Sequence, residues 1–482
     1  MHSSVSNKQI VSGTFWKFGE RLVVQGVSFV VSLVLARLLM PEDYGAVAVV
    51  NVFIEIANVI LVNGLNAALI QKKEVTQKEI SSLFYCSAVL GVLLYALLFL
   101  TAPLLAAAYQ MPILTPVIRV FALRLPFSAV QSIQSALVSR KMDFKQSFLA
   151  NGGASLISSA IGIAMAFAGC GVWALVTQHL SGVILGTVIL CFIVRWRPSL
   201  EFSWKTAKPL LSYGWKVMAT DLIGTVFNNM SAMLVGLRYS SAQLGYYSKG
   251  KQLPQLIRSN LFATVISVLF PAMSRIGEDK EELRRFSDRC INTMTYLFFP
   301  LMLGMICVAE PMVLVLYTKK WSAMVPFIMI ACVECLLSIL PNISLLTLRS
   351  AGYSGDMLKL EFLKKPILLL SILLALQHSV LAVAWTLPLN SVLDTLFNAV
   401  YTKKRFGYSL WQQLKATLSP LALSAAMAAA VLTVGLLPLA PLPLLMVQVL
   451  TGAAVYLLLS WLFGVSAFFD LLRVAKKLFK KK

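Results

Sequence analysis

The sequence predicts an all-α polytopic protein that crosses a membrane about fourteen times. Two features of its composition support this fold class: 58% of the 482 residues are hydrophobic, and only 13% are charged. A third is that the apolar residues lie in stretches of about 20, the length that an α-helix needs to cross the hydrocarbon core. Few residues remain for a soluble catalytic domain.

Short polar joints separate these apolar stretches. We expect helices because unpaired backbone in hydrocarbon costs several kcal/mol, and the unbroken apolar runs do not fit the alternating pattern of barrel strands. In chain order the expected spans are 14–38, 44–70, 80–101, 113–138, 146–168, 172–194, 209–237, 252–273, 289–309, 323–348, 361–378, 380–402, 413–437 and 442–465.

The net charge of +22 reflects membrane topology. About 30 of the 42 Lys and Arg residues lie in the tails and in the joints that follow even-numbered spans, and only about six lie in the other joints. This bias predicts cytoplasmic termini, with no role for nucleic acid. The first span has no cleavage site and is expected to be retained, and the basic tail 476–482 is expected to contact anionic lipid headgroups.

An internal repeat is visible at two places. The Trp-Lys pair at 16–17 recurs at 215–216, and the glycine of 44–45 recurs in 244–245, in each case about 200 residues later. An even number of spans separates the copies, so both halves would have the same orientation in the membrane. Chance similarity between apolar segments is the alternative explanation.

Basic residues inside or at the edge of the spans are the candidate cargo-binding residues. A basic residue at a helix centre costs about 2.5–3.5 kcal/mol even on the lenient insertion scale, so it usually faces water or a counter-ion. We interpret the set as binding an anionic cargo, although those near helix starts could instead reach the interface. The candidates are Lys17, Arg21, Arg119, Arg124, Lys216 and Arg258.

Acidic residues within the spans allow two interpretations. Glu20 lies three residues from Lys17, which favours charge compensation for Glu20. Asp221, five residues from Lys216, and Glu55 fit compensation and proton or sodium coupling equally well, and Glu20 is a third coupling candidate. Glu334 and Asp394 complete the set of acids within spans. The seven cysteines and three histidines are dispersed, so no metal site, cofactor or catalytic residue is expected.

The first hairpin reads Arg-Leu-Leu-Met-Pro-Glu-Asp-Tyr-Gly over 37–45. Together with Leu-Gly-Tyr-Tyr-Ser-Lys at 244–249, Leu-Phe-Pro-Ala at 269–272 and Arg-Ser-Ala-Gly at 349–352, it resembles the Wzx-type flippases of the polysaccharide biosynthesis and export family. These belong to the multidrug/oligosaccharidyl-lipid/polysaccharide superfamily. The chain is most similar to the branch that contains the colanic acid exporter.

The resemblance implies two six-helix lobes around a cationic cavity, at 1–200 and 201–405, with two further helices and a basic tail at 406–482. It implies a transporter rather than an enzyme. The implied cargo is an undecaprenyl-diphosphate-linked oligosaccharide, moved from the cytoplasmic to the periplasmic leaflet by alternating access for surface polysaccharide synthesis. Membrane lipids, and a polysaccharide polymerase with its chain-length machinery, are the implied partners.

A cation-coupled drug antiporter and a membrane-embedded glycan polymerase or ligase are the alternative functions. A cation-coupled drug antiporter of the same superfamily would favour acidic over basic cavity residues. A membrane-embedded glycan polymerase or ligase would need a large external loop, and the expected external joints are short.

Overall fold

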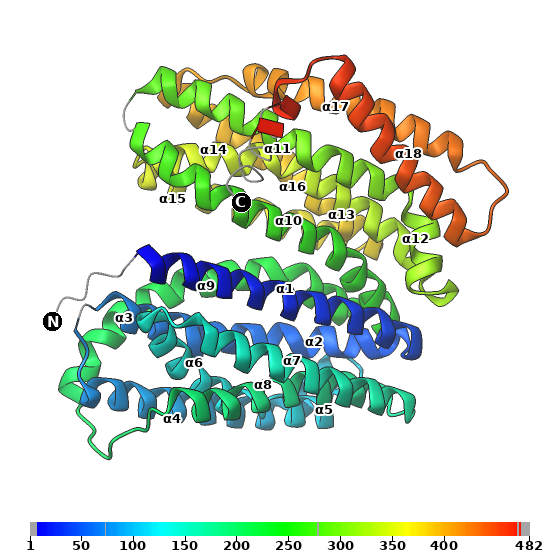
Figure 1. Cartoon of the computed structure of the whole chain (residues 1–482). Coiled ribbons are helices and arrows are strands. Elements are labelled where there is room, and N and C mark those ends of the chain that lie inside the picture. The colour runs from blue at the N-terminus through cyan, green and yellow to red at the C-terminus, as the bar shows by residue number, and fades with distance from the viewer. Residues whose placement is uncertain (1–6, 73, 277–278, 470–471, 474–482) are drawn as a thin grey trace. The chain divides into compact units, whose positions relative to one another are not determined.

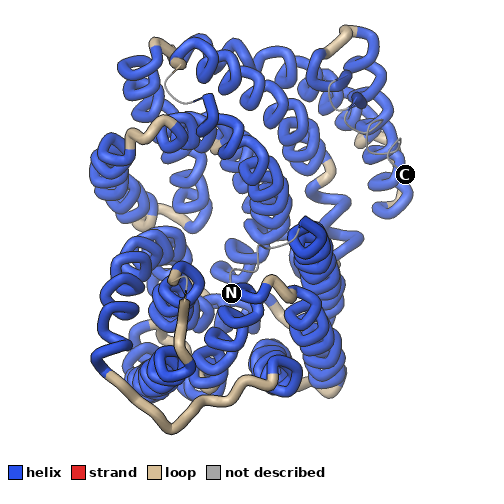
Figure 2. Tube along the Cα trace, turned by 60° about the vertical axis from the view of Figure 1, so that its left-hand side comes forward, coloured by secondary structure: helices blue, strands red, loops and turns tan. Residues whose placement is uncertain are grey.

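A computed structural model describes residues 7–72, 74–276, 279–469 and 472–473. Within these ranges the regular structure is helical and no strand occurs, as the tube in Figure 2 shows. The predicted all-α class is confirmed. The chain divides into two compact units, Met1–Gly245 (unit 1) and Tyr246–Lys482 (unit 2).

Unit 1 contains the helices drawn in blue to green in Figure 1. Its principal contacts join α7 to α8 and α1, α4 to α6, and α9 to α2 and α3. The elements are α1 (Asn7–Leu38), α2 (Pro41–Asn58), the π-helical turn η1 (Val59–Asn63), α3 (Gly64–Gln71), α4 (Gln77–Ala108), α5 (Leu114–Phe121), α6 (Arg124–Lys141), α7 (Phe144–Phe167), α8 (Val172–Val194) and α9 (Trp204–Arg238).

Unit 2 begins inside α10 (Ser241–Ile276). Its contacts join α11 to α17, α17 to α18, and α13, α14 and α15 to α16. The other elements are α11 (Lys280–Cys307), α12 (Ala309–Leu316), the 3₁₀ turn η2 (Lys319–Met324), α13 (Val325–Leu337), α14 (Ile339–Ser350), α15 (Ser354–Ala375), α16 (Val380–Phe406), α17 (Leu410–Val434) and α18 (Pro441–Leu462). The expected lobe boundary at residue 200 stays a prediction. The two compact units divide after residue 245, so α9 belongs to unit 1, where it packs on α2 and α3.

The chain is a multi-pass membrane protein. In the described part of the chain, 10 helical segments are long and apolar enough to cross a membrane. The other long segments are α5 with α6, α9, α10 and α15. These segments contain Arg119, Arg124, Lys216, Asp221, Arg258 and Lys364. The described part of the chain thus has ten candidate membrane-spanning segments, where the sequence predicts about fourteen spans.

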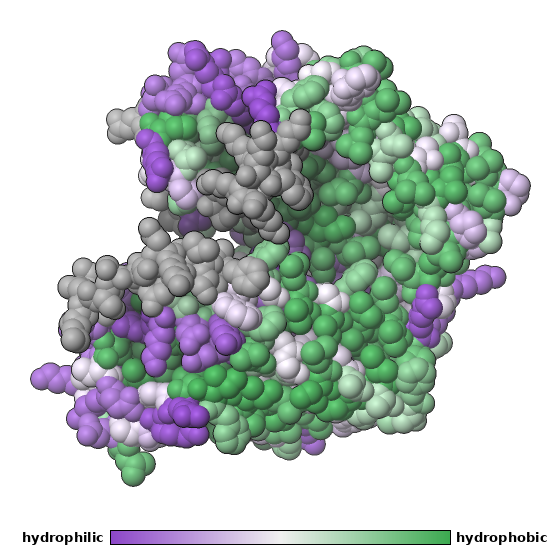
Figure 3. All heavy atoms as spheres, in the orientation of Figure 1, coloured by the Kyte–Doolittle hydropathy of each residue, from purple (hydrophilic) through white to green (hydrophobic). Residues whose placement is uncertain are grey.

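The exposed surface also fits a lipid environment. On α4, Leu93, Leu97, Leu100 and Leu104 follow one helix face, and each is 55–73% exposed. On the face drawn in Figure 3, apolar side chains cover most of unit 1, and hydrophilic side chains gather at one end of its helices. Soluble proteins rarely expose a contiguous apolar surface of this extent to water.

The two copies of the internal repeat have the same local structure. At the start of α2, the Met40 N–H donates to Asp43 Oδ2 at 3.0 Å. At the start of α10, the Ser240 N–H donates to Gln243 Oε1 at 3.4 Å. In both cases the side chain three residues into the helix caps the residue before it, so equivalent positions begin both helices.

These two helix starts also touch each other, in a reciprocal way. A Cβ on Gly45 would lie 1.8 Å from the carbonyl oxygen of Ser241, and a Cβ on Gly245 would lie 2.1 Å from that of Pro41. The Ser241 hydroxyl donates to the Glu42 carbonyl at 2.6 Å. Each repeat glycine thus faces the first residue of the other helix. This reciprocity is the contact that two parallel repeats related by a two-fold axis would make.

Candidate functional site

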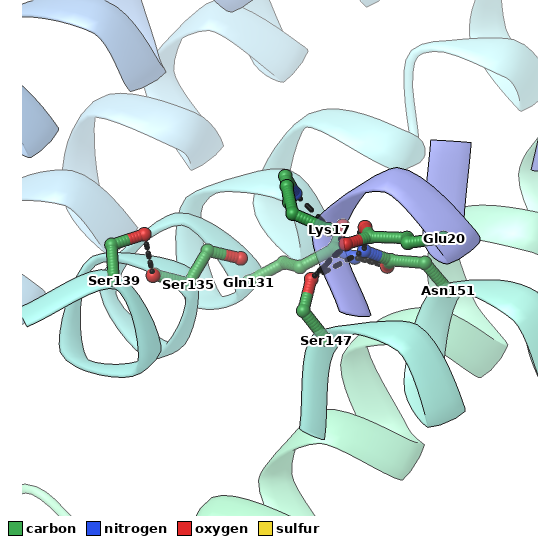
Figure 4. A network of polar contacts seen from close by, with 7 residues as sticks. All are labelled: Lys17, Glu20, Gln131, Ser135, Ser139, Ser147 and Asn151. Atoms are coloured by element: carbon green, nitrogen blue, oxygen red, sulfur yellow. Dashed lines mark hydrogen bonds and ion pairs between the residues drawn. The ribbon is translucent and has the colours of Figure 1, made fainter. Parts of the chain in front are cut away.

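A buried carboxylate lies where α1 meets α7 (Figure 4). Glu20 is 7% exposed. Its carboxylate accepts hydrogen bonds from Lys17 Nζ at 2.9 Å, Asn151 Nδ2 at 2.6 Å and the Ser147 hydroxyl at 3.0 Å. Three donors offset much of the cost of burying this charge.

The network reaches a third helix through amides. Ser147 and Asn151 are one turn apart on α7, so both face α1. Gln131 of α6 donates from Nε2 to Asn151 Oδ1 at 3.3 Å. Glu20 therefore ties α1 to α7 and, through Asn151, to α6. The geometry fits the charge-compensation interpretation of Glu20, whose role in ion coupling stays a prediction.

The two basic residues of α1 lie at its surface. Lys17 has a 57% exposed side chain even though it pairs with Glu20, and its ammonium lies 5.8 Å from the centre of the Phe144 ring. Arg21 is also exposed. The Lys17 charge is compensated by Glu20, so Arg21 is the α1 cation that is more available to an anionic ligand.

We expect Glu20→Ala to destabilise the protein, because it leaves the buried donors of Asn151 and Ser147 without an acceptor, at about 1–3 kcal/mol. Glu20→Gln keeps one acceptor oxygen and should lose less. Thermal unfolding of the detergent-purified protein measures both. Glu201→Ala is the control, since its 3.7 Å pair with Lys78 is exposed on both sides and should contribute little. Equal unfolding temperatures for Glu20→Ala and the control would contradict this account.

A second polar cluster joins α2 to α9. Asn229 donates from Nδ2 to Glu55 Oε2 at 2.9 Å, and Asn63 donates from Nδ2 to Asp221 Oδ2 at 2.9 Å. The two pairs lie about 12 Å apart along the helices. Each helix supplies one carboxylate and one amide, so neither acid has a cation as its hydrogen-bond partner in these pairs. We call these four residues the α2–α9 polar seam.

The backbone is irregular beside the seam. Asn63 ends the π-helical turn η1, a local widening that is frequent at functional sites. The next residue, Gly64, packs against Gly214 of α9 so closely that a Cβ on either would lie within 2.6 Å of the other's carbonyl oxygen. The amide oxygen of Asn66 is buried without a hydrogen-bond partner. Close backbone contact and an unsatisfied amide thus lie at one end of the seam.

Arg124 lies beside the other end of the seam. It is the first residue of α6, its guanidinium carbon lies 5.3 Å from the centre of the Phe121 ring, and the carboxylate of Glu55 attracts its charge. Its Nε is buried and has no hydrogen-bond partner. A half-buried guanidinium whose Nε donor is buried and unused can bind an anionic oxygen.

Arg119 does not share this environment. It lies on α5, which ends at Phe121, and its Nε donates to the Phe99 carbonyl of α4 at 3.4 Å. Its guanidinium carbon lies 4.4 Å from the centre of the Phe99 ring. The two arginines of the predicted fourth span therefore point to different neighbours, and only Arg124 is near the seam. Lys216 of α9 is exposed.

In unit 2 the candidate cation is compensated. Arg258 of α10 lies 3.3 Å from Glu334 of α13, whose side chain is 12% exposed. Lys364 of α15 is a basic residue that the sequence interpretation missed. It is buried, it donates to Asn398 Oδ1 at 2.6 Å, and it lies 3.4 Å from Asp394 Oδ1.

Sequence reasoning also missed the neutral partners. Glu20, Glu55, Asp221 and Lys364 each have an asparagine partner on another helix. The available signal was the presence of an amide inside an apolar stretch, where an unsatisfied polar group is costly. In the described residues, no group of three or more His, Cys, Asp and Glu side chains could hold a metal ion.

The chain is similar to proteins of polysaccharide biosynthesis and transport. The family described as polysaccharide biosynthesis protein matches residues 34–326. The succinoglycan biosynthesis transport protein ExoT of Rhizobium meliloti is 25% identical over 67% of this chain and 65% of its own length. The lipopolysaccharide biosynthesis protein WzxC of Escherichia coli is 24% identical over 70% and 68%. The teichuronic acid biosynthesis protein TuaB of Bacillus subtilis is 23% identical over 87% and 88%.

Solved structures share the fold at low sequence identity. The lipid II flippase MurJ in an inward closed conformation has a TM-score of 0.73 and is 16% identical, covering 96% of this chain and 100% of its own. An inward-facing multidrug transporter of the MATE family has a TM-score of 0.59 and is 14% identical, covering 80% and 95%. The predicted MATE-like class is confirmed by these likenesses.

Proposed function

Because the chain belongs to the polysaccharide biosynthesis protein family, we propose that it moves a lipid-linked oligosaccharide across the membrane for surface polysaccharide synthesis. The proposed cargo is an undecaprenyl-diphosphate-linked repeat unit, and it moves from the cytoplasmic to the periplasmic leaflet of a bacterial inner membrane. Both termini are cytoplasmic in this proposal, in agreement with the bias of basic residues. No covalent step is involved.

The observation that carries the proposal is the environment of Arg124. A diphosphate cannot cross hydrocarbon without charge compensation, and a guanidinium can bind two of its oxygens at once. Arg124 has a buried and unused donor, and its nearby acid, Glu55, has an asparagine as a second partner. An arriving diphosphate can therefore replace the attraction of Glu55, which keeps its bond to Asn229.

The other candidate residues differ in exposure and in charge pairing, and we assign their roles accordingly. Arg21 and Lys216 are exposed and extend the cationic surface, whereas Lys17 and Arg258 are paired with acids and contribute through those pairs. Arg119 is a secondary contact. Glu55 and Asp221 are the proposed ion-coupling acids, because each has only a neutral amide as its hydrogen-bond partner in the seam. Glu20 is less suited, since Lys17 already compensates it.

Reconstituted vesicles test the proposal. We expect the purified protein to expose a fluorescent undecaprenyl-diphosphate sugar to a membrane-impermeant quencher, while a fluorescent phosphatidylcholine stays protected. Glu201→Ala serves as the matched variant, because it changes a surface charge far from the seam. Equal rates for both lipids, or no rate above protein-free vesicles, would contradict the proposal. Uptake of a cationic drug without movement of the lipid would support the antiporter alternative.

A further inference from the structure

We propose that unit 2 binds an anionic phospholipid of the surrounding bilayer, in a polar pocket and an apolar groove that follow one another along α11. The polar pocket has a volume of about 400 Å³ and the apolar groove about 700 Å³. Both are lined by α11, by α17 and by the segment that follows α18. The inference does not depend on the identity of the transported cargo.

Small residues on two helices leave part of the groove unfilled. Pro300 and Gly304 of α11 and Gly452 and Ala453 of α18 are among its lining residues. The groove follows the C-terminal half of α11 from Tyr296 to Val308, the residue after its end, over about 18 Å. This length is comparable to that of an extended fatty acyl chain.

The polar pocket carries a net positive charge. Its lining contains the exposed cations Arg289 of α11 and Lys415 of α17, together with one acid, Asp288. The Asp288 carboxylate already accepts a hydrogen bond from the Tyr408 hydroxyl. The two basic side chains therefore remain available, and a phosphate with its single negative charge would complement them.

The pocket and the groove are continuous along the chain. Thr293 lines the pocket, and Tyr296, one turn further along α11, lines the groove. After α18, Ala467 lines the pocket and Phe468 the groove. The Tyr456 hydroxyl donates to the Tyr296 carbonyl at 2.7 Å and fixes α18 against α11 at this junction. One molecule with a charged head and an apolar tail would therefore occupy both cavities.

A bilayer phospholipid fits this arrangement better than other anions. Free phosphate would use the polar pocket and leave the groove empty, and a neutral lipid would leave the two cations without a counter-charge. Basic pockets among membrane helices recognise anionic headgroups in this way. Anionic phospholipids of the bilayer already surround a membrane protein of this kind, so they have access to the groove.

Native mass spectrometry of the delipidated full chain tests the proposal with phosphatidylglycerol and with phosphatidylcholine of the same acyl chains. We expect one phosphatidylglycerol to bind roughly tenfold more tightly than phosphatidylcholine. Arg289→Gln with Lys415→Gln should abolish this preference, whereas Lys280→Gln with Lys404→Gln removes two exposed charges outside the pocket and should preserve it. Ala453→Trp should fill the groove and lower the affinity for both lipids, whereas Ala454→Trp, next to it but outside the lining, should not.

Four results would overturn the proposal. Three of them are equal affinity for both lipids in the unaltered chain, equal losses in the lining and control variants, and displacement of phosphatidylglycerol by inorganic phosphate alone. Displacement by undecaprenyl diphosphate but not by a second phospholipid would assign the cavities to the cargo instead, and would also overturn it. The pocket variant and the groove variant are independent, so if one of them does not fold, the other still tests the proposal. The vesicle transport assay reports separately on the proposed function.

Discussion

Replacing Arg124 by alanine is expected to abolish surface polysaccharide while the protein still inserts into the membrane. The guanidinium is half-buried, has a buried and unused Nε donor and lies near Glu55, so its loss removes a cation from the end of the seam. Each hydrogen bond to a charged group is worth about 1.5–3 kcal/mol, so two lost bonds to a diphosphate would slow transport by at least about a hundredfold.

The measurement is surface polysaccharide from a strain that carries only the variant, with membrane-fraction immunoblots to confirm insertion. Lipid-linked repeats should accumulate on the inner leaflet. Arg119→Ala is the matched control, because it removes the same side chain from a neighbouring helix where the guanidinium packs on Phe99, and its effect should be smaller. Arg124→Lys keeps the charge but loses bidentate geometry and should restore only part of the output. Full output from the Arg119→Ala and Arg124→Ala double variant would remove the cation-binding argument.

Substituting alanine for Gly45 or Gly245 is expected to prevent most molecules of the variant from folding. The added Cβ would lie 1.8 Å or 2.1 Å from a backbone carbonyl oxygen of the other repeat. Overpacking of a core usually costs about 1–3 kcal/mol, and here the obstacle is backbone rather than a movable side chain. The first turns of α2 and α10 would have to separate, which would break the bond from Ser241 to Glu42.

Fluorescence-detected size-exclusion chromatography of tagged variants measures the folded yield. Gly224→Ala is the matched control, because a Cβ there would contact nothing within 4 Å and alanine favours the helix of α9. We expect the control to equal the unaltered chain, and Gly45→Ala and Gly245→Ala to elute mostly as aggregate. Normal elution of both would show that the two helix starts are not held in contact.

The sequence predicted the positions of the helices better than the contacts between them. Hydropathy alone locates most helices, because a span must satisfy its own backbone. It does not reveal that Asn63 meets Asp221, since these residues are 158 positions apart and an amide gives little periodic signal. Pro116 and Pro126 lie on either side of the break between α5 and α6, but the position of the break depends on packing.

The site was predicted only in part for the same reason. Charge identified Arg124, Glu55 and Asp221, because ionisable residues in apolar stretches are conspicuous. It gave Arg119 and Arg124 equal weight, and only the neighbouring helices distinguish the arginine that packs on Phe99 from the one beside Glu55. The π-helical turn could not be predicted, nor could the close approach of Gly64, directly after it, to Gly214.

The boundary between the two units falls within a helix rather than in a linker. Residue 245 is the last of unit 1 and lies in the second turn of α10, held there by the reciprocal glycine contact. Gly250, still in α10, packs on Phe327 of unit 2, where an added Cβ would lie 2.6 Å from the Phe327 Cβ. The contacts of both units therefore continue along one helix, and Pro254 and Pro271 lie further along it, at positions where a helix can bend. A proline-to-alanine series at these two positions would change the flexibility of α10 in steps.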